Sequence, residues 1–385
     1  MDPETSQYCS REIAGRLLDT MTEGSAPSTG TCHRIPSMSD PVRIHMRIPG
    51  TAPMPALMQL IESIEAAGFD GIGVLDSQLI ARDTFITLAQ AATRTKRLQL
   101  FPAVTNPFTR HPSVLASAIQ TVEEMAPGRV KFVIGTGFTS ASTIGRKPAT
   151  LAEMRSCIGT VKALLAGETT DWNGAPGRLA FASGRRIPVL MAGSGPKAIA
   201  TAGEVADGAV LMVGFNRTLV EGALEHLESG ARRAGRRVED LELIWAVRMG
   251  TAATMAEARR QARPTAVHWA IRWEGQWLER AGIRTPKLQA PEAVWKIYPD
   301  LSHAEDWEAA IEATSFVSDE LVGEMCDALG LVGTPEYCAD RIIEMTKLGV
   351  RNIYLMPFQT FATPESEIPA FRDVIFPRLR AAGLR

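Results

Sequence analysis

Apolar runs alternate with helical patterns from Val42 to Met356, and this alternation constrains the fold more than any other feature. Most runs are apolar throughout rather than at every second residue, which indicates strands buried on both faces. Eight such strands separated by helices predict a closed (β/α)₈ TIM barrel with insertions. The predicted strands span residues 42–48, 70–75, 98–104, 130–134, 187–192, 208–213, 241–247 and 352–356. The predicted helices span residues 55–67, 84–92, 112–125, 151–165, 196–204, 218–234 and 336–348.

An open, doubly wound α/β sheet is the alternative fold. The dinucleotide-binding version of that sheet needs three glycines at fixed spacing directly after a strand. Gly193 and Gly195 match the first two, but Ala198 stands where the third is required. The sequence therefore favours the barrel.

Two segments interrupt the alternation. Residues 169–186 are typical of a β-hairpin that turns at Asn173-Gly174. Residues 251–332 are too long for a βα connection, so we expect an insertion with its own structure. Its tryptophans Trp269, Trp273 and Trp277 are spaced to lie along one face of any helix there. The stripe either packs the insertion onto the barrel or forms a wall of the substrate pocket.

The first 37 residues differ in character from the rest. They are polar, lack regular periodicity and contain no hydrophobic core of a secretion signal. We expect a disordered extension over residues 1–37, followed by one barrel domain over residues 38–385. Met38 stands at this boundary, and translation from either Met1 or Met38 is left open.

Composition limits the possible partners. A net charge of −2 gives no basic surface for nucleic acid, and no apolar run reaches the length of about 18 residues that a membrane-spanning helix needs. The five cysteines show no metal-ligand spacing, and their odd number argues against a disulfide framework. Cys157 lies in a predicted helix and is interpreted as a buried structural thiol. We therefore expect a cytoplasmic protein with a small-molecule substrate, no bound metal, and no nucleic-acid or membrane partner; a homodimer is left open.

Polar loops follow several predicted strands at the end where parallel α/β folds bind ligands. The most informative loop is Thr105-Asn106-Pro107, which breaks an apolar run and precedes the helix opened by Pro112. The others begin at Asp76, at Gly135-Thr136-Gly137 and at Gly193-Ser194-Gly195.

The loop Gly193-Ser194-Gly195-Pro196-Lys197 suits an anion. Its glycines let backbone N–H groups approach a ligand, and the helix N-terminus beyond Pro196 offers donors and the positive end of the helix dipole. These residues predict a phosphate site, with a tight turn of purely structural purpose as the alternative.

Together these residues resemble the luciferase-like monooxygenase superfamily, and in particular its coenzyme F420-dependent branch that includes methylenetetrahydromethanopterin reductases. The resemblance rests on Ala67-Gly68-Phe69-Asp70-Gly71 leading to Asp76, on Thr105-Asn106-Pro107-Phe108-Thr109-Arg110-His111-Pro112, and on Pro127-Gly128-Arg129-Val130 leading to Gly135-Thr136-Gly137. It continues through residues 145–150 and 187–197 and through Ala206-Asp207-Gly208-Ala209. Residues 251–332 and the N-terminal extension show no such resemblance.

The resemblance implies a (β/α)₈ barrel with a flat flavin or deazaflavin ring at the C-terminal ends of the strands. It also implies a bulge with a cis peptide bond at Ala103–Val104. The phosphate-bearing tail would lie along Ala192, Gly193, Ser194 and Gly195. The residues implied to bind cofactor are Asp76, Ala103, Val104, Asn106, Gly137, Ala192, Gly193, Ser194 and Gly195.

One departure from the family concerns proton transfer. Sugar-phosphate dehydrogenases of this branch have a histidine and a glutamate where this chain has Ser77 and Phe138, which argues against a sugar-phosphate substrate. His111 and Asp83 are the remaining candidates for acid/base work, and a structural role is favoured for both.

The resemblance implies an oxidoreductase that transfers a hydride between coenzyme F420 and an organic small molecule. A monooxygenase that uses FMN and oxygen is the alternative enzyme. A barrel that has lost catalysis and acts as a binding protein is the alternative of another class.

Overall fold

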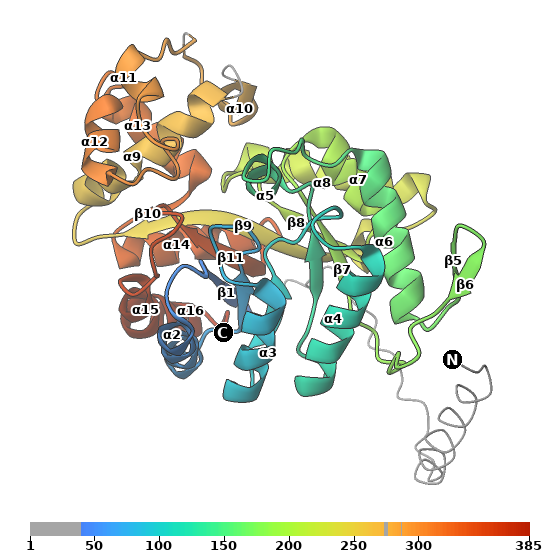
Figure 1. Cartoon of the computed structure of the whole chain (residues 1–385). Coiled ribbons are helices and arrows are strands. Elements are labelled where there is room, and N and C mark those ends of the chain that lie inside the picture. The colour runs from blue at the N-terminus through green and yellow to red at the C-terminus, as the bar shows by residue number, and fades with distance from the viewer. Residues whose placement is uncertain (1–39, 273–275, 286) are drawn as a thin grey trace, which may run out of the picture. The chain divides into compact units, whose positions relative to one another are not determined.

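The computed structural model describes residues 40–385 except 273–275 and 286, so the expectation for residues 1–37 lies outside the described residues. Eight parallel strands form the barrel in the order β3-β2-β1-β11-β9-β8-β7-β4 (Figure 1). Bridges Leu100–Val130 and Thr105–Ile134 join the β3 and β4 segments and close the barrel. The strands are β1 (Arg43–Ile48), β2 (Gly71–Val74), β3 (Gln99–Pro102), β4 (Phe132–Ile134), β7 (Val189–Gly193), β8 (Gly208–Leu211), β9 (Glu242–Thr251) and β11 (Asn352–Pro357). The predicted TIM barrel is confirmed.

Seven helices follow the strands where the periodicity predicts them. Side chains of Asp83, His111, Thr150, Asn216 and Thr334 accept hydrogen bonds from the first turns of α3, α4, α6, α8 and α14, which explains where these helices begin. The bounds of the seven are α2 (Met54–Ala67), α3 (Thr84–Arg94), α4 (Pro112–Met125), α6 (Leu151–Leu165), α7 (Pro196–Val205), α8 (Arg217–Arg233) and α14 (Pro335–Thr346). Shorter elements are α5 (Phe138–Ser142), η2 (Val238–Asp240), α15 (Glu367–Ala370), η3 (Phe371–Ile375) and α16 (Phe376–Ala381).

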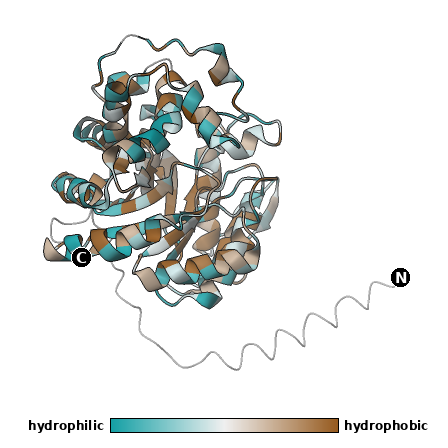
Figure 2. Ribbon diagram, turned by 90° about the vertical axis from the view of Figure 1, so that its left-hand side faces the viewer, coloured by the Kyte–Doolittle hydropathy of each residue, from teal (hydrophilic) through white to brown (hydrophobic). Residues whose placement is uncertain are grey.

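The barrel interior is apolar at mid-height and charged toward the N-terminal ends of the strands. Phe101, Leu190, Ile244 and Tyr354 belong to the interior cluster, and a Cβ on Gly73 would lie 2.6 Å from the Phe101 and Tyr354 rings. Only glycine therefore fits beside these rings. A second, larger apolar layer packs the strands against the helices, whose outer faces are hydrophilic (Figure 2).

The insertion is helical, with one additional strand. Strand β10 (Gly330–Gly333) pairs in parallel with β9, which the sequence pattern did not predict. The helices gather above one end of the barrel (Figure 1), and α9 and α13 contact β10. They are α9 (Met255–Arg272), α10 (Gln276–Arg280), α11 (Glu292–Trp295), α12 (Trp307–Ala313) and α13 (Asp319–Leu329). The predicted hairpin at 169–186 is confirmed as antiparallel strands β5 (Thr170–Trp172) and β6 (Ala175–Gly177).

The tryptophan stripe is divided between two helices. Trp269 lies in α9 and Trp277 in α10, and their rings meet edge to face with centroids 5.7 Å apart. Trp273 lies outside the described residues. Within the described part of the chain, no helix is both long and apolar enough to cross a membrane.

Candidate active site at the C-terminal ends of the strands

The residues implied to bind cofactor come together on one side of the barrel mouth. They lie at the ends of β2, β3, β4 and β7, which the closed strand order places next to one another. The end of β2 contributes Asp76, the end of β3 contributes Ala103, Val104 and Asn106, the end of β4 contributes Gly137, and the end of β7 contributes Ala192, Gly193, Ser194 and Gly195.

Asp76 is a buried carboxylate held by an arginine. Its side chain is 3% exposed, and it accepts a hydrogen bond of 2.8 Å from Arg110 Nη1 and one of 3.0 Å from Gln78 Nε2. Arg110 also bonds to Asp83 at 2.5 Å and lies over the Phe85 ring. Burial raises the pKa of Asp76, while the charge of Arg110 opposes that rise. The pair ties the loop after β2 to the loop after β3.

The side chain of Asn106 holds the loop after β3 together through hydrogen bonds. It is fully buried, and its Oδ1 accepts hydrogen bonds from the backbone of Phe108 and Thr109 and from the Thr109 hydroxyl. Its Nδ2 donates to Ser140 Oγ in α5 at 3.1 Å. Asn106 therefore fixes the loop to α5 and positions the backbone around it.

Two glycines after β4 allow neighbouring side chains to pack directly against the backbone. Gly137 has a φ of +77°, and a Cβ there would lie 2.8 Å from both Asn106 Cβ and Phe108 Cζ. A Cβ on Gly135 would lie 2.8 Å from Val104 Cγ2. The peptide bond between Ala103 and Val104 is cis, as the resemblance led us to expect. The bulge and the loop after β4 therefore lie in close contact.

The N-terminus of α7 is open toward a cavity. No side chain caps this helix, in contrast to α3, α4, α6, α8 and α14, and a Cβ on Gly195 would have no heavy atom within 4 Å. The cavity of about 420 Å³ is lined by Ser194 and Gly195 on one side and by Trp269, Trp277 and Arg280 of the insertion on the other. Uncapped N–H groups beside open space suit a phosphate or another anion.

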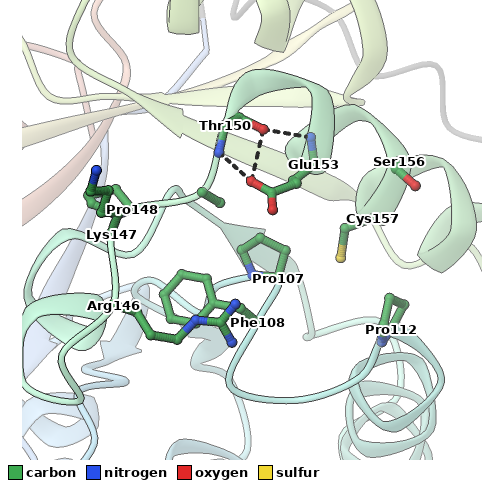
Figure 3. A pocket seen from close by; sticks show the side chains of 11 residues that line it. Pro107, Phe108, Pro112, Arg146, Lys147, Pro148, Thr150, Glu153, Ser156 and Cys157 are labelled. Carbon is green, nitrogen blue, oxygen red and sulfur yellow. Dashed lines mark hydrogen bonds between the residues drawn. The ribbon is translucent and has the colours of Figure 1, made fainter.

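A second cavity, of about 490 Å³, lies behind the loop after β3 (Figure 3). Arg146 lies over the Phe108 ring at 5.1 Å, and Glu153 is bound to Thr150 in a capping box. Burial raises the pKa of the Cys157 thiol to about 11, so it stays protonated at neutral pH, in keeping with the predicted structural role.

The two candidates for acid/base work are helix caps. Asp83 accepts from the backbone of Phe85 and Ile86 at the start of α3. His111 accepts from the backbone of Ser113 at the start of α4, and its ring lies 4.8 Å from the Trp172 ring. These contacts are those of structural residues.

The sequence reading missed two arginines on the opposite side of the barrel mouth. Arg47 lies in β1 and Arg248 in β9, and these strands flank β11. The available signal was a charged residue within an otherwise apolar run, at a position that faces the barrel interior by alternation.

Residues 37–352 match the model of a family described as luciferase-like monooxygenase. The chain belongs to this family. The resemblance inferred from the residues is thus confirmed. A 5,10-methylenetetrahydromethanopterin reductase of Methanolobus tindarius is 28% identical over 301 residues, covering 75% of this chain and 86% of that relative. An F420-dependent glucose-6-phosphate dehydrogenase of Beutenbergia cavernae is 34% identical over 203 residues, covering 47% of this chain and 59% of that relative.

Solved structures of other proteins share the fold of this luciferase-like chain. The coenzyme F420-dependent tetrahydromethanopterin reductase of Methanopyrus kandleri has a TM-score of 0.72 at 23% identity and covers 88% of this chain and 99% of its own. A long-chain alkane monooxygenase has a TM-score of 0.63 at 13% identity and covers 90% and 92%. At these identities the likeness concerns the barrel alone.

Proposed function

We propose that the chain is an oxidoreductase that passes a hydride between coenzyme F420 and an organic small molecule. The observation that carries the proposal is the joint placement, on one side of the barrel mouth, of an uncapped α7 N-terminus, an open Gly195, and two glycines, Gly135 and Gly137, packed against the end of β3. Membership of the luciferase-like family and the F420-dependent reductases among its relatives support it.

The residues present fit the cofactor. A Cβ on Gly135 would lie 2.8 Å from Val104 Cγ2, so glycine there lets Val104 pack directly on the backbone of the loop after β4. The α7 N-terminus and Ser194 would hold the phosphate of the tail through N–H and O–H donors. When bound, the ring supplies the two-electron chemistry.

The protein's contribution is orientation. The Asp76–Arg110 pair and the Asn106 hydrogen bonds fix the loops after β2 and β3 against each other before any ligand arrives. Such preorganised loops hold a bound ring at a constant angle to the substrate. The charge of Asp76 is compensated by Arg110, so this pair orients rather than transfers protons.

Cofactor binding and turnover test the proposal. The full chain is titrated with F420 and, separately, with FMN, and each complex is exposed to oxygen. We expect reversible F420 binding without oxygen uptake. Retained FMN with oxygen uptake would instead indicate the monooxygenase, and failure to bind either cofactor would favour the catalytically inactive barrel. A substrate screen that follows the absorbance of F420 then identifies the organic partner.

A further inference from the structure

Two arginines face each other across β11 at the mouth of the barrel. Arg248 of β9 is in register with Met356 of β11. Arg47 of β1 lies two residues beyond His45, which is in register with Tyr354, so Arg47 is at the level of Met356 as well. The three strands are adjacent in the sheet (Figure 1). Both guanidinium groups therefore belong to one layer of the barrel interior.

The two arginines converge on one carbonyl group. Arg47 Nη2 donates to Pro357 O at 3.0 Å and to Gln359 O at 3.2 Å, and Arg248 Nη1 donates to Pro357 O at 3.4 Å. Arg47 is 4% exposed, whereas Arg248 keeps partial exposure. The Nε atoms of both are buried and have no hydrogen-bond partner in the described part of the chain.

No carboxylate of the described residues forms an ion pair with either arginine within 4.0 Å. The two carboxylates in the vicinity are otherwise engaged. Glu367 is buried and accepts a hydrogen bond from Ser366; burial raises its pKa, while the charge of Arg47 opposes that rise. Asp300 of the insertion lies 2.8 Å from His303 and 3.7 Å from His268. Glu367 attracts Arg47 and Asp300 attracts Arg248 through space, but neither carboxylate forms an ion pair or a hydrogen bond with these arginines.

Buried charges without a partner are costly and are rarely kept for stability alone. Desolvation and the charge of Arg47 lower the pKa of Arg248 to about 9, while Tyr354 and Asp300 oppose that shift. An anion brought by a ligand would satisfy both guanidinium groups.

The location matches that of a substrate. The candidate cofactor residues occupy the ends of β2, β3, β4 and β7, and in the closed strand order β11 and β9 lie directly across from β3 and β4. The insertion begins at the end of β9, and Thr360 in the loop after β11 donates to Ser302 of the insertion. The arginine layer therefore lies beneath the insertion, facing the cofactor loops.

We propose that Arg47 and Arg248 bind a carboxylate group of the substrate. The assignment rests on the proposed function, because it places the cofactor on the other side of the mouth. A carboxylate has two acceptor oxygens in one plane, which suits the planar donors of a guanidinium group, and Arg248 keeps partial exposure. The substrate class is thus an organic acid whose reacting carbon lies between the arginines and the cofactor loops.

Binding of small acids to the full chain, without cofactor, tests the assignment. Acetate, butyrate and benzoate are compared with the neutral amides of the same shape by calorimetry and by thermal unfolding at neutral pH. We expect the acids, and not the amides, to bind and to raise the melting temperature. Arg248→Met should weaken acid binding about 10-fold to 100-fold, as loss of hydrogen bonds to a charged group does. Arg248→Lys should retain part of the affinity.

Arg217→Met is the matched control, because Arg217 is an exposed arginine on α8 that pairs with Glu221. It should bind the acids as the parent chain does. Equal binding of acids and amides, preference for inorganic phosphate over every acid, or unchanged affinity in Arg248→Met would each overturn the assignment. Arg47→Met should weaken acid binding as well. If that variant fails to fold, the affinity of Arg248→Met for the acids alone decides whether the assignment holds. A chain that binds the acids but not F420 would refute the proposed function and leave the carboxylate site standing.

Discussion

The two sides of the barrel mouth differ in how their polar and charged side chains are paired. On the side formed by β2, β3, β4 and β7, polar side chains lie in loops and are satisfied by their neighbours, as in the Asp76–Arg110 pair and the Asn106 turn. On the side formed by β1, β11 and β9, the charged side chains of Arg47 and Arg248 lie within strands and form no ion pair with a described carboxylate. The loops after β2 and β3 thus have their hydrogen bonds satisfied without a ligand, whereas the Nε–H groups of the two arginines lack acceptors among the described residues.

This difference indicates how one fold can keep a cofactor and change its substrate. A cofactor held through backbone groups, glycine space and a helix N-terminus depends little on the exposed side chains of its loops. A substrate held by two side chains depends on them directly. The family match at residues 37–352 includes the insertion above the arginine side, so the expectation that residues 251–332 lack a resemblance to the family is wrong.

The largest effect is expected where the insertion meets the cofactor side. Trp277 is 2% exposed, lines the cavity next to Gly195, and its Nε1 donates to Val213 O at 3.1 Å. Trp277→Ala should lower the free energy of unfolding by about 3 to 5 kcal/mol, because a large buried ring leaves a cavity. Trp277→Phe, which keeps a ring, should cost much less.

Measuring F420 affinity on the same two variants shows whether the insertion contributes to F420 binding. A loss of stability with unchanged affinity per folded molecule would limit the tryptophans to packing. A loss of affinity in the folded Trp277→Phe variant would extend the cofactor side into the insertion.

The second prediction concerns Gly137 on the cofactor side. Gly137→Ala should destabilise the chain by about 1 to 3 kcal/mol and weaken F420 binding, because it combines a positive φ with close contacts to Asn106 and Phe108. Gly145→Ala is the control, since Gly145 has a φ of +67° but no heavy atom within 4 Å of its Cβ position. If both variants lose F420 affinity equally, backbone strain alone explains the effect and the tight packing of this loop is irrelevant.

The third prediction concerns the protonation of His45, which lies in β1 two residues before Arg47. Burial, and then the charge of Lys131, lower the pKa of His45 to about 3, while its hydrogen bond to Asn352 opposes the shift. The unfolded chain therefore binds a proton at this side chain below about pH 6.5, and the folded chain does not, so stability falls as the pH drops from 6.5 toward 3. The loss should be about 2 kcal/mol at pH 5. His45→Gln should remove this part of the acid sensitivity in denaturant unfolding; an unchanged pH dependence would mean that His45 is protonated in the folded chain.

The fourth prediction addresses the α7 N-terminus. Gly195→Val should weaken F420 binding about tenfold, because the side chain enters the space next to the uncapped N–H groups, while the fold tolerates it since nothing lies within 4 Å of the Cβ position. Gly159→Val, at an equally open position on α6, should leave F420 affinity unchanged. Tight F420 binding by Gly195→Val would move the phosphate site elsewhere.

The sequence predicted which loops lie together at the ends of β2, β3, β4 and β7, but it did not predict the pair of arginines, for a physical reason. Period and capping residues predicted the eight barrel strands and the helices between them, with α4 and α6 matched to the residue. Loops at strand ends carry glycines and prolines whose conformational demands can be read locally. Arg47 and Arg248 are 201 residues apart in the sequence, and only the strand order β1-β11-β9 brings them together. Strand β10 escaped prediction for the same reason, because only its pairing with β9 makes those four residues a strand.

The smallest effect, and the one that separates the two sides most directly, is expected from Arg248→Met in the absence of any ligand. Arg248 is a desolvated cation that forms no ion pair among the described residues, and its hydrogen bond to Pro357 O is long at 3.4 Å, so removal of its charge should raise the free energy of unfolding by about 1 kcal/mol. On the cofactor side, Arg110→Met should instead destabilise, because Asp76 would lose its counter-charge and remain buried. Denaturant unfolding of both variants, with the parent chain, gives the comparison. Opposite signs would mean that the arginine side sacrifices stability for binding; a loss of stability in both would mean that Arg248 serves to anchor the end of β11, and the contrast between the two sides would disappear.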